Sequence, residues 1–177
     1  MRIINKCFLS GLCVALGFTS PLHAATDTTT FDVTITITAA CDISTGTNGI
    51  ATLAFGSKDP FQANVAGQTD LKVTCTKGAP YDIGLDAGLN ESTSDDVSTR
   101  RMKGITSTPV DNTGEYVPYN LFQDAVHSTV WGNTIDNDTV ESTGTGAQQT
   151  FTIYGLVPST NYTVGDYKDT VTATVTF

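Results

Sequence analysis

The chain has 177 residues and a formal net charge of −9. Without residues 1–24, it keeps 7 basic against 18 acidic side chains, and the charge becomes −11. This acidity argues against nucleic acid or anionic lipid as a partner bound by general electrostatic attraction, and the length fits one ordinary domain.

The first 24 residues have the pattern of a secretory signal peptide. Arg2 and Lys6 precede an apolar stretch over residues 8–18, and the small residues Ala24 and Ala25 follow it. The apolar stretch is too short to span a bilayer, and no later segment is apolar for long enough. We therefore expect cleavage after Ala24 or Ala25 and export of a mature protein that does not insert into a membrane.

Residues 30–41 alternate between apolar and polar side chains more regularly than any other segment. The apolar members are Phe31, Val33, Ile35, Ile37 and Ala39, and they are separated by Asp32, Thr34, Thr36 and Thr38. Because successive side chains of an extended chain point to opposite faces, the pattern predicts a strand with one apolar edge and excludes a helix. At about 3.3 Å per residue, the apolar row spans roughly 25 to 30 Å.

Two of the four cysteines fall in the signal region. Cys7 and Cys13 leave with it, so Cys41 and Cys75 remain, and two cysteines in an exported chain predict one disulfide. Closing a loop of this size contributes on the order of 3 to 4 kcal/mol in the chain-entropy model. A redox or metal role would need neighbouring ligands, and His127 is the only histidine outside the signal region.

The rest of the chain predicts short strands separated by polar loops. Strands are expected at residues 50–55, 69–76, 81–86, 100–105, 116–122, 149–155 and 167–177, and loops at 42–48, 58–68, 88–99 and 132–148. Pro118 suits an edge strand or a bulge, and Pro158 is expected to turn the chain. Since no helical period persists over ten residues, the pattern predicts an all-β antiparallel sandwich.

No stretch of the sequence carries the pattern of a catalytic or metal site. No serine lies in a nucleophile elbow, no glycine loop could cradle phosphate, and no zinc spacing occurs, so we expect neither an enzyme nor a cofactor. The acidic residues between 136 and 141 do not match a calcium loop and are expected to be solvated. Arg100, Arg101 and Lys103 are expected to face solvent from the strand that they begin.

Several segments resemble the spore coat protein U family and, within it, the major pilin subunits of archaic (Csu-type) chaperone–usher pili. They are the opening strand into Cys41, the second cysteine in Val73-Thr74-Cys75, the aromatic segment Tyr119-Asn120-Leu121-Phe122 with Asp124, and the closing stretch from Gly165 to Phe177. The closing stretch, which begins Gly165-Asp166-Tyr167-Lys168-Asp169, is the most specific part of the resemblance.

The resemblance implies an immunoglobulin-like sandwich that lacks its last strand and is completed by a donor strand from another subunit. Residues 25–40 would be the donor-strand extension and residues 41–177 the pilin domain. The donor residues would be Phe31, Val33, Ile35, Ile37 and Ala39. A periplasmic chaperone would fill the open groove first, and an outer-membrane usher would exchange it for the next subunit. The product would be a head-to-tail surface fibre of a Gram-negative bacterium, used in attachment and biofilm formation.

Three alternatives to this fibre remain open from the residues. The alternating segment could be the first strand of a complete, self-contained sandwich, or it could fold back into the groove of its own monomer. A secreted module that binds carbohydrate through exposed Tyr116, Tyr119 or Trp131 is the third alternative. A tip adhesin of the same pilus class would need a second domain, for which this chain has no room.

Overall fold

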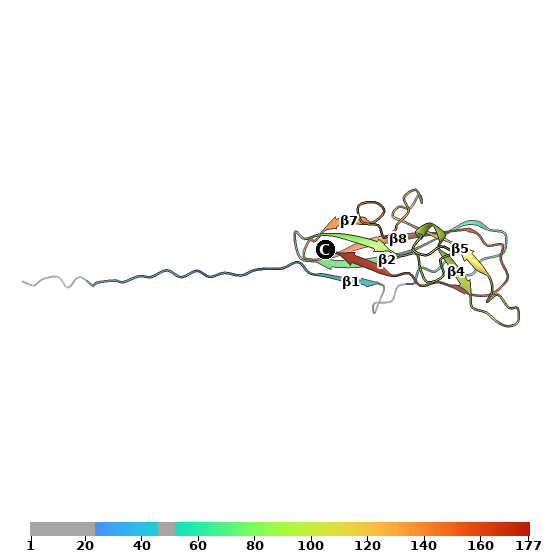
Figure 1. The fold of residues 1–177 in the computed structure, drawn as a ribbon, viewed down its shortest axis with the longest axis horizontal. Helices are drawn as coiled ribbons and strands as arrows, with labels where there is room; N and C mark the ends of the chain where they lie inside the picture. The colour runs from blue at the N-terminus through green and yellow to red at the C-terminus, as the bar shows by residue number, and fades with distance from the viewer. Residues whose placement is uncertain (1–23, 46–51) are drawn as a thin grey trace, which may run out of the picture. The chain divides into compact units, whose positions relative to one another are not determined.

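A computed structural model describes residues 24–45 and 52–177, and the predicted signal peptide falls almost entirely outside them. The chain divides into two units, one ending at Thr36 and the other, here called the body, running from Ile37 to Phe177. In the first unit, residues 24–36 form no regular secondary structure and their side chains are exposed. The body carries all of the described strands (Figure 1).

The body is built from ten strands and one 3-10 turn, and it contains no α-helix within the described residues. The strands are β1 (Cys41–Thr45), β2 (Ala63–Cys75), β3 (Pro80–Leu85), β4 (Arg101–Gly104), β5 (Tyr116–Pro118), β6 (Asn120–Phe122), β7 (Val140–Thr143), β8 (Gln148–Ser159), β9 (Tyr167–Lys168) and β10 (Ala173–Thr176), and the turn η1 covers Val97–Thr99. All strand pairs are antiparallel, which confirms the predicted all-β antiparallel fold.

The described strands form three sheets. The largest has the order β1-β2-β8-β6, the second has the order β10-β3-β7, and a small third sheet has the order β5-β4-β9. The first two sheets enclose the core, because Leu71 and Val73 of β2 and Ile83 and Leu85 of β3 belong to one buried cluster with Trp131. An edge-to-face contact between the rings of Tyr81 and Phe151, with centroids 6.3 Å apart, links the two layers.

Several predicted boundaries are wrong, for a common reason. Residues 42–45 belong to β1, 63–68 to β2, and 140–143 to β7, although all three ranges were predicted as loops. In these ranges the side chains that face water are polar, so at most every second residue can be apolar and the segment resembles a loop. In β2, for example, buried Val65 pairs with buried Val157. Pro158 does not turn the chain either, because β8 continues to Ser159.

Other predictions placed strands where pairing is missing or interrupted. Residues 30–40 have no strand pairing, and regular structure starts only at Cys41. The predicted strand at 50–55 is not formed over residues 52–55, and its first two residues lie outside the described part. The prediction that Pro118 suits an edge strand is confirmed, since Pro118 ends β5, which pairs with β4 alone among the described strands. The closing strand 167–177 divides into β9 and β10.

Candidate functional site

The predicted donor residues form an exposed apolar row. Phe31, Val33, Ile35 and Ile37 are between 75% and 86% exposed, and Ala39 is exposed as well. An exposed row of large apolar side chains is unfavourable in water, and such patches mark interaction sites. The apolar face that the alternating pattern predicted is therefore exposed and accessible to a binding partner.

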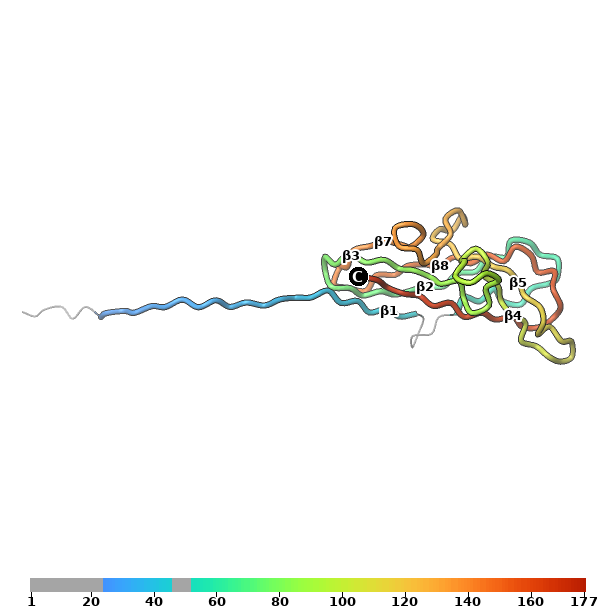
Figure 2. Tube along the Cα trace, viewed as in Figure 1, coloured from blue at the N-terminus to red at the C-terminus, as the bar shows by residue number. Residues whose placement is uncertain are grey.

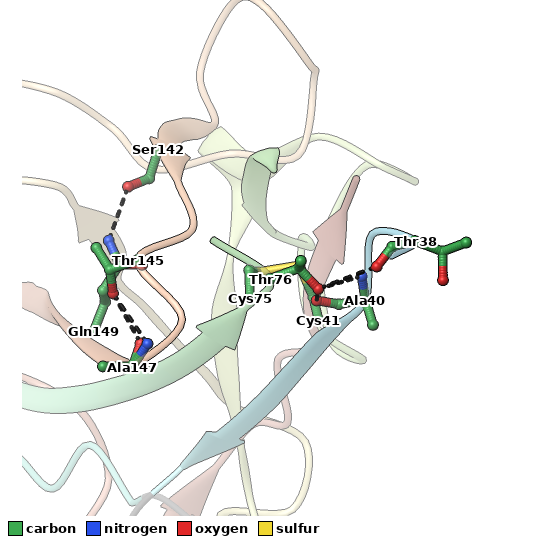
Figure 3. Close-up of a disulfide and its surroundings, with 9 residues drawn as sticks. All are labelled: Thr38, Ala40, Cys41, Cys75, Thr76, Ser142, Thr145, Ala147 and Gln149. Carbon is green, nitrogen blue, oxygen red and sulfur yellow. Dashed lines mark hydrogen bonds between the residues drawn. A yellow bond between two sulfur atoms is a disulfide. The ribbon is translucent and has the colours of Figure 1, made fainter. Parts of the chain in front are cut away.

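The root of the extension is fastened to the body at one place (Figure 3). The Cys41–Cys75 disulfide is present as predicted, with the two Cα atoms 4.1 Å apart. The hydroxyl of Thr76 accepts a hydrogen bond from the Ala40 N–H at 3.1 Å and lies 3.3 Å from the carbonyl oxygens of Thr38 and Ala40. The Thr76 N–H also donates to the Ala40 carbonyl at 2.9 Å. Residues 38–40 are thus held against Thr76, the residue directly after β2.

Two of the edge strands of the body, β1 and β10, lie beside a half-covered part of the core. Among the described residues, β1 pairs with β2 alone and β10 pairs with β3 alone. The inward side chains of both strands, Ile43 of β1 and Ala173 and Val175 of β10, pack against the core but stay half-buried. An edge strand beside a half-covered apolar core is a place where a further strand can be added.

The segment before β10 is held by tight backbone contacts. Gly165 has φ +144°, and a Cβ there would lie 2.5 Å from the Nδ2 atom of Asn112, so only glycine fits. Buried Asn112 donates to the Asp166 carbonyl at 3.2 Å and accepts from the Thr106 N–H at 2.8 Å. The Tyr167 hydroxyl donates to the Thr163 carbonyl at 2.7 Å. This gives a physical reason for the Gly-Asp-Tyr triplet at 165–167.

The carboxylate of Asp169 holds the next segment, residues 169–172, which connects β9 to β10. It accepts from the Tyr119 hydroxyl at 2.7 Å, from the Asn90 side-chain amide at 2.8 Å and from the Leu89 N–H at 3.1 Å. Asp86 makes the reciprocal contact, accepting from the Thr172 N–H at 2.9 Å. These bonds hold residues 169–172 in place, so that β10 keeps its position although it is an edge strand.

The phenol of Tyr119 gives a pH-dependent test of this anchor. Burial, and then the hydrogen bond to Asp169, raise the pKa of Tyr119 above its ordinary value of 10.0. The unfolded chain therefore loses this proton at a lower pH than the folded chain, and stability falls as the pH rises past about 10. We expect Tyr119→Phe to flatten this decline in urea midpoints measured from pH 8 to 11, compared with the unmodified protein. Equal slopes for the variant and the unmodified protein would contradict the assignment.

Arg100 is buried, contrary to the prediction that it faces solvent. Its Nε donates to the Asp86 carbonyl at 2.8 Å, its Nη1 to Trp131 at 2.9 Å, and its Nη2 to Leu85 at 2.6 Å. Burial lowers the pKa of its guanidinium, and nearby Tyr119 and carboxylates oppose this shift. Lys103 is exposed as predicted. Alternation puts Arg100 on the opposite face from Arg101 and Lys103, but the sequence offered no signal that this face is buried.

The aromatic residues proposed for a carbohydrate site do not form a solvent-facing group. Trp131 is 1% exposed and its indole N–H donates to the Ile83 carbonyl at 2.8 Å. Tyr119 is buried, and half-buried Tyr116 lies under the Arg101 guanidinium, 4.0 Å from the ring centroid. Aromatic side chains in these positions count against the carbohydrate-binding alternative.

The described residues contain no group of three or more His, Cys, Asp or Glu side chains arranged to hold a metal ion. Asp138 instead accepts from the Thr134 N–H at 2.7 Å, within its own loop. His127 packs edge-to-face on the Phe122 ring, with centroids 5.1 Å apart. No helix in residues 24–45 or 52–177 is suited to crossing a bilayer.

Comparison with known proteins agrees with this architecture. A chain of the CsuC–CsuE chaperone–tip adhesion subunit complex, from archaic chaperone-usher Csu pili of Acinetobacter baumannii, superposes with a TM-score of 0.52 at 21% identity. The match covers 80% of this chain but only 41% of that one, so it shows the immunoglobulin-like fold alone. Protein U of Myxococcus xanthus is 36% identical over 167 residues, which cover 89% of each chain. The family model of the Spore Coat Protein U domain matches residues 27–174, and the chain therefore belongs to that family.

Proposed function

We propose that the protein is a structural pilus subunit that polymerises by donor-strand complementation. The observation that carries the proposal is the alternating apolar row from Phe31 to Ala39, which is exposed and outside any strand, in a chain whose edge strands β1 and β10 pack half-buried side chains against the core. Residues 25–40 are the donor-strand extension, residues 41–177 are the pilin domain, and the row of one subunit occupies the space between β1 and β10 of the next.

Burial of the apolar row supplies a large gross binding energy for this contact. Burial of five apolar side chains yields on the order of 8 to 12 kcal/mol before ordering costs, at about 1.5 to 3 kcal/mol for each large side chain. Main-chain hydrogen bonds to an unpaired sheet edge add to this burial. Because donor and acceptor are different surfaces, the contact is heterologous and propagates as a filament.

The same exposed surfaces require protection before assembly. A periplasmic chaperone covers the acceptor edges first, and an outer-membrane usher replaces it with the extension of the next subunit. Support for this comes from the solved relative, which was crystallised as a chaperone–subunit complex of a chaperone-usher pilus. The fibre is exported to the cell surface, where it serves attachment and biofilm formation, and the subunit is not an enzyme.

The first experiment is an immunoblot of material sheared from the cell surface, with and without boiling. We expect a ladder of multimers that collapses to one band on boiling, because strand exchange is non-covalent. A single monomer band in both lanes, with the protein in the periplasm or the medium, would contradict the proposal. That result would instead favour a self-contained secreted module.

A further inference from the structure

The body has two different ends. The junction end contains the Cys41–Cys75 disulfide, the start of β3 and the loop 144–147 before β8, and the C-terminus lies there as well. The opposite end, which we call the distal end, contains the turn at 59–62, the segment 105–112 and the segment 160–166. Figure 2 shows β4 and β5 toward the distal end, away from the C-terminus. The 13 residues of β2 separate the two ends by roughly 40 Å.

Large apolar side chains are exposed at the distal end. They are Phe61, Ile105, Val110, Tyr162 and Val164. Backbone contacts bring their segments together: the Ile105 N–H donates to the Asp166 carbonyl at 2.9 Å, and the Gln62 N–H donates to the Thr160 hydroxyl at 2.9 Å. The clustering of these side chains at one end indicates an interaction surface.

Phe61 is presented on this surface in an unfavourable backbone conformation. Its φ is +68°, a region that bulky residues rarely adopt, and its side chain is 81% exposed. The turn is nevertheless fixed, because the Thr160 hydroxyl contacts the carbonyl oxygens of Asp59 at 3.0 Å and Gln62 at 3.2 Å. Strain that is held in place by surrounding bonds is characteristic of functional positions.

The direction of the donor strand identifies what meets this surface. This step rests on the proposed function. If residue 39 of the donor lay at the junction end of the acceptor, two like ends would face each other, and the pair could close by exchanging strands. A filament requires contact between unlike ends, so the donor's body must lie at the acceptor's distal end. The donor then runs antiparallel to β10, which points toward the junction end.

The connection between the two bodies is too short to hold them apart. Thr76 fixes residues 38 and 40 to the donor's own body, so almost no free chain lies between the inserted row and that body. A residue spans at most about 3.6 Å, and therefore the two bodies must touch. The junction end offers small exposed residues, Ala40, Pro80 and Ala147, on which large side chains can pack.

We infer that the distal end, with Phe61 at its edge, is the surface on which the junction end of the neighbouring subunit packs. This contact is additional to donor-strand insertion. It supports each joint of the fibre from outside the groove, and it explains why a phenylalanine occupies a position that favours glycine or asparagine.

Cysteine cross-linking in intact fibres tests the contact. A chain carrying Phe61→Cys and Ala147→Cys, treated with a short bis-maleimide, should give multimers that resist boiling, since the two ends of one body are too far apart to react. The matched control combines Val126→Cys, an exposed apolar position on a loop outside the distal end, with Ala147→Cys, and it should stay boiling-sensitive.

The outcomes separate the contact from the polymerisation itself. Boiling-sensitive ladders without cross-links, both from this pair and from Phe61→Cys with Pro80→Cys, would overturn the contact while leaving strand exchange intact. Equal cross-linking by the Val126 control would also overturn it, because the reaction would then be unspecific. Absence of a ladder from the unmodified protein would refute the proposed function itself.

Discussion

Ile35→Asp should abolish multimers in the unboiled lane while the monomer keeps its Cys41–Cys75 disulfide. Ile35 is the central member of the apolar row and is 86% exposed, so the substitution disturbs no packing within its own body. In the fibre, the same side chain would enter an apolar space, where an unpaired carboxylate costs several kcal/mol. We therefore expect a loss of assembly of at least about a hundredfold, which corresponds to roughly 2.7 kcal/mol.

The control for this variant is Thr36→Asp. It introduces the same charge one residue away, on the face that alternation turns toward solvent, and it should form normal ladders. Both variants should show the same mobility shift on reduction, since neither changes the disulfide. Normal ladders from Ile35→Asp, or equal loss from both variants, would show that the row is not inserted in the predicted phase.

Arg100→Met should lower the free energy of unfolding by about 3 kcal/mol. The substitution keeps much of the apolar stem, but it leaves the carbonyl oxygens of Leu85, Asp86 and Trp131 without their charged donor. Each hydrogen bond to a charged group contributes about 1.5 to 3 kcal/mol, and buried acceptors without partners are costly. Urea unfolding of the monomeric Ile35→Asp background measures this loss without interference from assembly.

Two further substitutions distinguish the guanidinium geometry from its charge. Arg100→Lys keeps the charge but not the planar set of donors, so it should recover only part of the stability. Exposed Lys103→Met, on β4 just after Arg100, should change the free energy of unfolding by less than about 0.5 kcal/mol. An Arg100→Met protein as stable as Lys103→Met would show that the buried cation is dispensable.

Two features of the molecule could be predicted from the sequence: the apolar row, from its alternating pattern, and the disulfide, from the number of cysteines. Neither prediction depends on distant neighbours. Strand ends were less predictable, since β7 and the first half of β2 are polar on their solvent side and resemble loops. The alternating row also looked like an ordinary strand, although none of the described residues pairs with it.

Long-range polar contacts were the least predictable feature. Asp169 and Tyr119 are 50 positions apart, and Arg100 reaches carbonyl groups on segments up to 31 positions away. Alternation places Arg100 and Arg101 on opposite faces, but nothing in the local sequence marks the Arg100 face as buried, because burial depends on where β3 and Trp131 lie. The family resemblance marked the Gly165–Asp169 segment, but only the structure supplied a physical reason for it.

The disulfide at the root of the extension also determines how a fibre would carry mechanical load. Tension applied to one subunit's extension arrives at Cys41 and crosses the covalent bond to Cys75, the last residue of β2. β2 pairs with β8 over eleven registered positions, from Ala63 to Thr74, so the pull enters the most extensively paired part of the body. The short β1 is thereby spared from being peeled away, and a cell attached through such a fibre would pull on cross-linked backbone at every joint.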